Sequence, residues 1–204
     1  MSWRQPRSLQ IRQLLAASLG LVGFLALAGY ALDRAFQQTA KDNLHQRLEN
    51  YALAYADKSD FARNGEFIPP YDPIDPRFER PGSGLYAEVV LPNAHWDSHS
   101  GQGPMLPASK MLESNEERFE GPLPITQIKG TAGEVYRYGR GFIWSAEGDA
   151  KAEFPYTIYI LEDTTALAQQ VAVFRAALWR YLGGAGLILL LLQTVVLRWS
   201  LRPL

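Results

Sequence analysis

His95, Asp97 and His99 are the residues of this chain whose spacing most directly suggests metal chemistry. In an extended strand, residues two apart share a face, so two imidazoles and one carboxylate could converge on a single ion. Imidazole nitrogens and carboxylate oxygens are both ligands that Zn²⁺ accepts. The pattern predicts a metal site, and the alternative is a polar strand or turn whose side chains are solvated.

Four neighbouring glutamates form a second candidate site, for a cationic ligand: Glu113, Glu116, Glu117 and Glu120. If this segment is a helix, spacings of three and four place most of them along one face, where their charges repel unless a hard cation or a basic partner neutralises them. The alternative is a solvated polar face, because Arg118 lies within the run and no Asp-rich loop with calcium spacing is present.

Motifs of the common enzyme classes are missing from the sequence. It contains no cysteine, no Gly-rich phosphate loop, no G-x-S-x-G and no H-E-x-x-H. We therefore expect no catalytic residue and no cofactor in this chain, apart from a divalent cation at the histidine or glutamate group. We expect no nucleic-acid partner.

A small antiparallel sheet is predicted to position the candidate residues. The run Leu85–Leu91 is rich in β-branched and aromatic residues, and His95–Ser98 could be its returning strand. Glu134–Ser145 and Glu153–Leu161 have the same character and are separated by Gly148-Asp149, which predicts a second hairpin.

Two helices are predicted to flank this sheet. Asp33–Lys58 carries an apolar stripe at helical spacing, and a second stripe begins at Leu167 and continues through Leu178. Clusters of proline and glycine predict loops over Pro69–Gly84 and Gly121–Gly133. The predicted fold class is α+β, with a long N-terminal helix, a small antiparallel sheet and a C-terminal helix.

Two uncharged segments, Gln13–Leu32 and Tyr181–Leu197, are long enough to cross a membrane. All 21 acidic residues lie between them, whereas arginines lie beyond their outer ends: Arg4, Arg7, Arg12, Arg198 and Arg202. Arginine-rich short flanks stay in the cytoplasm, so both termini are predicted inside and residues 33–180 outside. The alternative for the first segment is a secretory signal cleaved after Ala26-Leu27-Ala28.

Four stretches of the chain together resemble one protein family: Leu85–Val90, Trp96–Ser100, Phe174–Trp179 and Val196–Leu204. They are similar to the N-terminal half of PhoQ-like sensor histidine kinases from Gram-negative bacteria. Leu-Arg-Trp-Ser-Leu-Arg-Pro-Leu at the end of the sequence is the most distinctive part, because it looks like the entry to a HAMP linker.

The resemblance implies a PAS-like periplasmic sensor domain in a homodimer of the bacterial inner membrane. It divides the chain into a cytoplasmic N-terminus (1–12), a first transmembrane helix (13–32), the sensor domain (33–180), a second transmembrane helix (181–197) and the start of HAMP (198–204). A kinase module that uses ATP and Mg²⁺ and phosphorylates a cognate response regulator would follow. The best-known members carry a dense acidic patch for divalent cations. Glu113–Glu120 is a sparser counterpart, so the implied signal could also be a cationic peptide, a small molecule or pH.

Gln193 and Pro203 are the predicted signal-coupling residues. Gln193 is the strongly polar side chain of the second span, where such a group faces a helix partner or the interface. Pro203 matches the family's proline at the start of HAMP, and proline removes a backbone donor. Two rival functions remain: a two-span scaffold that binds an envelope component, and an anchored periplasmic hydrolase.

Overall fold

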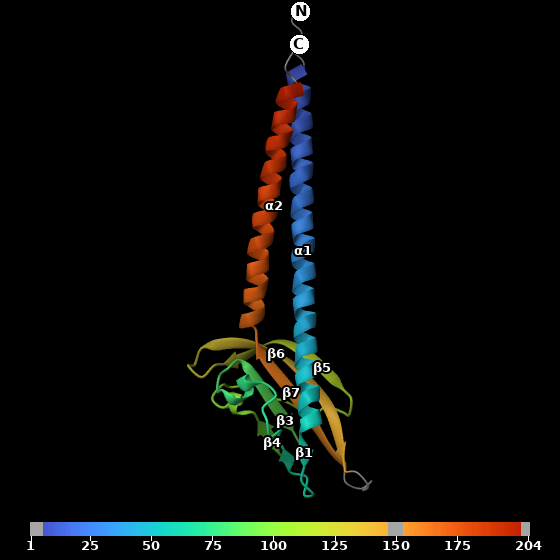
Figure 1. Cartoon of the computed structure of the whole chain (residues 1–204), viewed down its shortest axis with the longest axis vertical. Coiled ribbons are helices and arrows are strands. Elements are labelled where there is room, and N and C mark those ends of the chain that lie inside the picture. Colours follow the sequence, from blue (N-terminus) through green and yellow to red (C-terminus); the bar gives the residue numbers. More distant parts are fainter. Residues whose placement is uncertain (1–5, 147–152, 201–204) are drawn as a thin grey trace, which may run out of the picture. The chain divides into compact units, whose positions relative to one another are not determined.

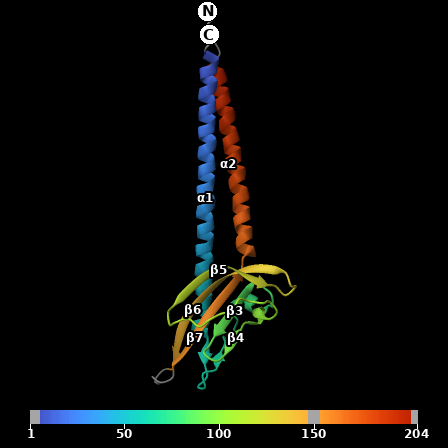
Figure 2. The same cartoon turned by 180° about the vertical axis from the view of Figure 1, so that it is seen from behind.

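The computed structural model describes residues 6–146 and 153–200. The chain divides into two compact units. One is the sheet unit, Lys41–Leu167, and the other is the helical unit, formed by the two helical ends of the chain up to Ala40 and from Ala168. Figures 1 and 2 show the elements of both units from opposite sides.

Two long helices, α1 (Pro6–Lys58) and α2 (Thr165–Ser200), begin and end the described chain. Both are long and apolar enough to cross a membrane. Within the helical unit, the rings of Phe36 and Phe174 stack with centroids 3.9 Å apart. Asp33 accepts two hydrogen bonds from Arg175, each 3.0 Å long. The two helices therefore pack against each other in this unit through both an aromatic and an ionic contact.

Gly29 is a position where the two helices of the helical unit approach each other closely. A Cβ at Gly29 would lie 2.9 Å from Leu182 and 3.1 Å from Trp179. A Cβ at Gly20 or Gly23 would meet nothing within 4 Å. Of these glycines in the first apolar segment, only Gly29 is needed for packing.

The centre of the sheet unit is a five-stranded antiparallel sheet with the order β4-β3-β7-β6-β5. Its strands are β3 (Leu85–Val90), β4 (His95–Asp97), β5 (Glu117–Thr126), β6 (Ala132–Ser145) and β7 (Glu153–Asp163). The minor elements are the pair β1 (Asp60–Phe61) and β2 (Phe67–Ile68) and two short 3₁₀ helices, η1 (Pro76–Glu79) and η2 (His99–Gly101).

One face of the sheet packs on the end of α1. Side chains alternate between the two faces of a strand, so Ile158 and Ile160 of β7 point to the same side. They pack with Leu44 and Leu48 of α1 in the larger core cluster, and all four are almost fully buried. The stripe predicted within Asp33–Lys58 is confirmed, because most of its side chains are buried, among them Leu44, Leu48 and Tyr55.

The opposite face of the sheet is covered by the segment 104–116, which we call the strap. Leu112 of the strap packs with Tyr159 in the second core cluster. The backbone of the strap bonds directly to β6, because Asn115 donates to the Gly141 carbonyl at 2.9 Å and the Gly141 amide donates to Glu116 at 3.0 Å. A Cβ at Gly141 would collide with the Glu113 carbonyl, so a glycine is required where the strap crosses.

An ionic network ties α1 to the end of β7 in the sheet unit. Glu162, whose side chain is 5% exposed, accepts from Arg47 of α1 at 2.8 Å and from Arg77 of η1 at 3.1 Å. Asp75 accepts from the Arg77 amide at 2.8 Å and from the Tyr51 hydroxyl at 2.7 Å. Because Glu162 is the next-to-last residue of β7, the network reaches the point where the sheet ends.

Most predicted elements are confirmed. The strand at Leu85–Leu91, its return at His95 and the hairpin of Glu134–Ser145 with Glu153–Leu161 are β3, β4, β6 and β7. The predicted loop over Gly121–Gly133 is wrong, because β5 and β6 occupy most of it. Its prolines lie beside a register shift between Glu120 and Leu123, which is where a strand tolerates them.

Candidate functional site

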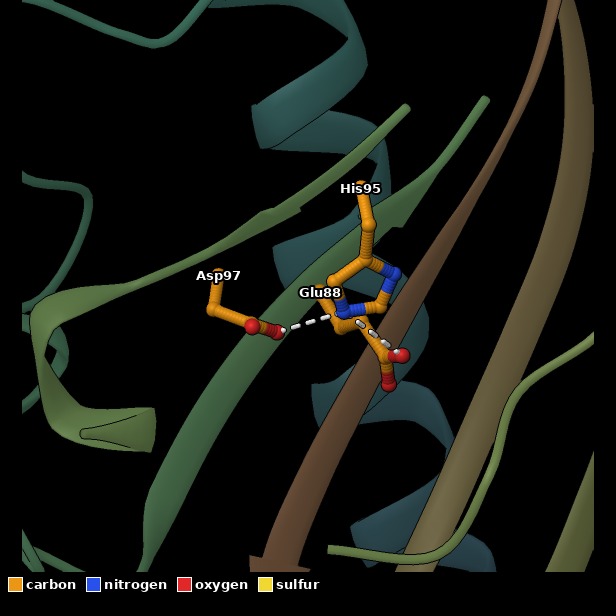
Figure 3. Close-up of side chains that lie close together, drawn as sticks. All are labelled: Glu88, His95 and Asp97. Atoms are coloured by element: carbon orange, nitrogen blue, oxygen red, sulfur yellow. Dashed lines mark hydrogen bonds and ion pairs between the residues drawn. The ribbon is translucent and has the colours of Figure 1, made fainter. Parts of the chain in front are cut away.

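The hairpin of β3 and β4 brings Glu88, His95 and Asp97 together on the face of the sheet that the strap covers. Glu88 pairs across the hairpin with Asp97, and Val90 pairs with His95. Directly paired residues share a face, and residues two apart do so as well. Three ligand-type side chains therefore point the same way, and Figure 3 shows His95 between the two carboxylates.

Distances among the three side chains are short. His95 Nε2 lies 3.2 Å from Glu88 Oε1 and 3.0 Å from Asp97 Oδ1. One ligand atom from each residue lies within 4.8 Å of the others. The Glu88 side chain is 5% exposed, whereas His95 and Asp97 are 46% and 43% exposed. The cluster thus has one buried member, Glu88, and two members that are partly open to solvent, His95 and Asp97.

An open cavity of about 400 Å³ lies over this cluster, and it is lined by the three side chains and by strap residues including Pro104, Leu106 and Ser109. Ser109 Oγ donates to Glu88 Oε2 at 2.7 Å. Arg137 of β6 donates to Ser109 Oγ at 3.1 Å and to the Ala108 carbonyl at 2.9 Å, and it is ion-paired with Glu120. The strap is therefore fixed beside the cluster by side chains of the sheet.

Burial raises the pKa of the Glu88 carboxyl above its ordinary value, because the charged form loses solvation. The hydrogen bond from Ser109 and the proximity of His95 act in the opposite direction. A carboxylate placed this deep is stabilised only when a donor or a cation faces it. His95 is the exposed member of the cluster that can supply such a donor, whereas the Asp97 carboxylate raises the pKa of Glu88 further.

The structure brings together only part of the predicted histidine site. His95 and Asp97 meet, but His99 begins η2 and its Nδ1 lies 2.7 Å from Glu79 Oε2 instead. The third member of the cluster is Glu88, which the sequence reasoning missed because it considered one strand at a time. An acidic residue inside the apolar run Leu85–Val90 was the available signal.

The predicted helical face of four glutamates is wrong, because β5 begins at Glu117 and the preceding residues belong to the strap. Neighbouring arginines neutralise three of these glutamates. Glu116 pairs with Arg118 at 2.9 Å, Glu117 pairs with Arg140 at 2.9 Å, and Glu120 pairs with Arg137. Glu113 lies in the strap and offers its amide to Glu116 at 3.0 Å.

The two predicted coupling residues fall in different parts of the chain. Gln193 Oε1 lies 3.4 Å from Ser18 Oγ within the helical unit, so this polar side chain faces the other helix. Pro203 lies outside the described residues.

A second cavity, of about 330 Å³, lies beside the first, and Asp97 lines both. Its wall is aromatic and proline-rich, with Tyr55, Trp96 and Tyr71, and His99 and Glu79 lie at its edge. The Tyr71 side chain is 99% exposed. The proline and glycine pattern of Pro69–Gly84 predicts a loop but carries no signal for this cavity.

No protein-family model, curated protein or solved structure matches the chain. The description of the site therefore depends on the geometry of this structure alone.

Proposed function

We propose that this chain is the sensor and transmembrane portion of a two-component sensor histidine kinase. In this proposal the sheet unit is a PAS-like domain in the periplasm, α1 and α2 cross the bacterial inner membrane, and both termini are cytoplasmic. The chain forms a homodimer and passes a signal through the second span and a HAMP linker to a kinase module and its response regulator.

The observation that carries the proposal is the connection between sheet and helices. β7 ends at Asp163 and α2 begins at Thr165, so one residue separates the last strand from the second apolar helix. At the other end, α1 is continuous from its apolar segment to the residues that pack on the sheet. A change in the sheet unit can thus reach both helices without passing through a long flexible loop.

Two further features support this function. The order of elements is the one expected from the sequence: a long N-terminal helix, a five-stranded antiparallel sheet and a C-terminal helix. The Arg47–Glu162 ion pair joins α1 to β7 close to the start of α2. A ligand shifts such a system only by its differential affinity for the two states, and about 1 to 3 kcal/mol changes the output roughly 5- to 150-fold.

Topology is tested with alkaline phosphatase, which is active only outside the cytoplasm. We expect activity when the enzyme is inserted at the Asn64-Gly65 turn and none when it is fused after Leu204. Activity at the fusion after Leu204 would contradict the proposal.

Signalling is tested by joining the chain to the HAMP and kinase modules of another sensor kinase, with a response-regulator reporter. We expect the Glu162→Gln substitution to change the reporter output, because it weakens the link between α1 and β7. A chimera that is dimeric and inserted but whose output is the same with and without the sheet unit favours the rival, a two-span scaffold.

A further inference from the structure

We propose that Glu88, His95 and Asp97 bind a divalent transition-metal ion of the Zn²⁺ class. The ligand atoms are Glu88 Oε1, His95 Nε2 and Asp97 Oδ1, whose side chains lie close together (Figure 3) and line the 400 Å³ cavity. As a binding site this assignment is independent of the proposed function, whereas its role as the signal rests on that function.

At the centre of the cluster, the single hydrogen that His95 Nε2 can carry is too few for the two carboxylate oxygens that face it. His95 Nε2 faces a carboxylate oxygen on each side, at 3.2 Å and 3.0 Å. That nitrogen carries at most one hydrogen and an ionised carboxylate carries none, so one N–H faces two acceptors. A metal ion that replaces this single proton contacts all three atoms at once.

The separations of the three ligand atoms are also near those of a tetrahedral metal site. Zn–N and Zn–O bonds are about 2.0 to 2.2 Å long, which places neighbouring corners of a tetrahedron about 3.3 to 3.6 Å apart. The two separations from His95 Nε2, 3.2 Å and 3.0 Å, are slightly shorter than that edge, and the third lies within 4.8 Å. Small side-chain movements complete the site.

The mixed ligand set selects the class of ion. Ca²⁺ takes six to eight oxygen ligands and Mg²⁺ demands an octahedron of oxygens, so a site with one imidazole and two carboxylates suits neither. Zn²⁺ and its first-row neighbours accept nitrogen and oxygen together. Three protein ligands leave the fourth position to water from the cavity, which is large enough to supply it.

The surroundings supply the outer shell that metal-bound carboxylates require. Ser109 donates a hydrogen bond to Glu88 Oε2, so the other oxygen, Oε1, is the one that faces His95 Nε2 and the ion. Arg137 in turn donates hydrogen bonds to Ser109 Oγ and to the Ala108 carbonyl of the strap. Loss of such a partner lowers metal affinity by about 10- to 100-fold. Ion binding is thereby linked to the position of the strap.

The test measures metal binding by the full chain, purified in detergent without a polyhistidine tag. Equilibrium dialysis against Zn²⁺, Mg²⁺ and Ca²⁺ gives stoichiometry and affinity. We expect one Zn²⁺ per chain and at least about 100-fold weaker binding of the other two ions. His95→Ala and the near-isosteric Glu88→Gln should each weaken Zn²⁺ binding by at least about 100-fold, and Ser109→Ala by about 10-fold.

His99→Ala is the matched control, because it removes a nearby histidine that pairs with Glu79. It should leave Zn²⁺ affinity unchanged. Far-UV circular dichroism identifies variants that remain folded. The proposal is overturned if the folded chain binds no Zn²⁺, if Glu88→Gln binds it as well as the original chain, or if binding requires His99. If Zn²⁺ binds as expected but the kinase chimera does not respond to it, the site stands and the ion is not the signal.

Discussion

Arg47 Nη2 and Glu162 Oε2 lie 2.8 Å apart, joining the first helix to the last strand of the sheet. Glu162 also forms an ion pair with Arg77, so one buried carboxylate neutralises two guanidinium groups. Removing it leaves both cations without this partner. The pair is therefore a structural link as well as an element of the proposed signalling route.

Glu162→Ala should lower the free energy of unfolding of the sheet unit by about 2 to 3 kcal/mol. This is less than the ~3 to 5 kcal/mol for breaking a fully buried pair, because both arginines reach solvent. Urea unfolding followed by the fluorescence of Trp96 and Trp144 measures the change. Glu49→Ala, which removes a 4.0 Å surface contact with Arg140, is the control and should change stability by about 0.5 kcal/mol or less. Equal effects of the two substitutions would contradict the assigned role of Glu162.

Acid should destabilise the sheet unit through Asp75. Burial opposes the charged form, but hydrogen bonds from the Arg77 amide, the Tyr51 hydroxyl and the Arg77 side chain outweigh it and hold the pKa of Asp75 at about 2, below its ordinary 3.8. A carboxyl with a lowered folded-state pKa stabilises the fold above its unfolded-state pKa. We expect about 1 to 2 kcal/mol to be lost as the pH falls from 4 to 2.

The comparison that isolates Asp75 is the same acid titration of Asp75→Asn. This variant should be less stable at pH 7 and should lose less stability between pH 4 and pH 2. An identical pH profile in both proteins would assign the acid sensitivity to other carboxyl groups.

Gly141→Ala should destabilise the sheet unit by about 2 kcal/mol or more, because the new methyl group collides with the Glu113 carbonyl of the strap. Thermal unfolding in detergent measures the loss. Gly101→Ala is the control, since its methyl group would make only ordinary contacts of 3.7 Å with Asp97 and Leu106. If Gly141→Ala unfolds at the original temperature, the strap does not cross β6 as described.

Gly29→Val should separate the two helices of the helical unit, because its side chain occupies the space of Leu182 and Trp179. Gly23→Val, with nothing within 4 Å of the added Cβ, should not. The chain has no cysteine, so cysteines placed at Phe36 and Phe174 can be cross-linked within one chain by a short thiol-reactive reagent. We expect a clear drop in cross-link yield for Gly29→Val alone. Equal yields in both variants would show that Gly29 is not a packing position.

Local sequence patterns predicted the elements whose side chains alternate or recur regularly. The stripe that begins at Leu167 is the half-buried side of α2, and Glu153–Leu161 is a strand because its residues are β-branched and aromatic. Such patterns reflect burial on one face, so they survive in the folded chain. Gly121–Gly133 is the exception, because Pro122 and Pro124 favour a loop in the sequence but lie within β5 in the structure.

Only part of the candidate site could be predicted from the sequence, because its members come from two different strands. His95 and Asp97 are two residues apart on one strand, which is a local relationship. Glu88 joins them only through the pairing of β3 with β4, in which Glu88 lies opposite Asp97. That pairing depends on the length of the turn, and a shift of one residue would have turned Glu88 to the other face.

The outermost strands of the sheet also determine how copies of this protein can associate. β4 has only three residues, and β5 contains two prolines and a register shift, so neither offers a long row of free amides and carbonyls to another chain. Natural proteins use these features to prevent strand addition and aggregation. Strand addition from another copy is therefore disfavoured at both outer strands of the sheet, which also opposes growth into fibres.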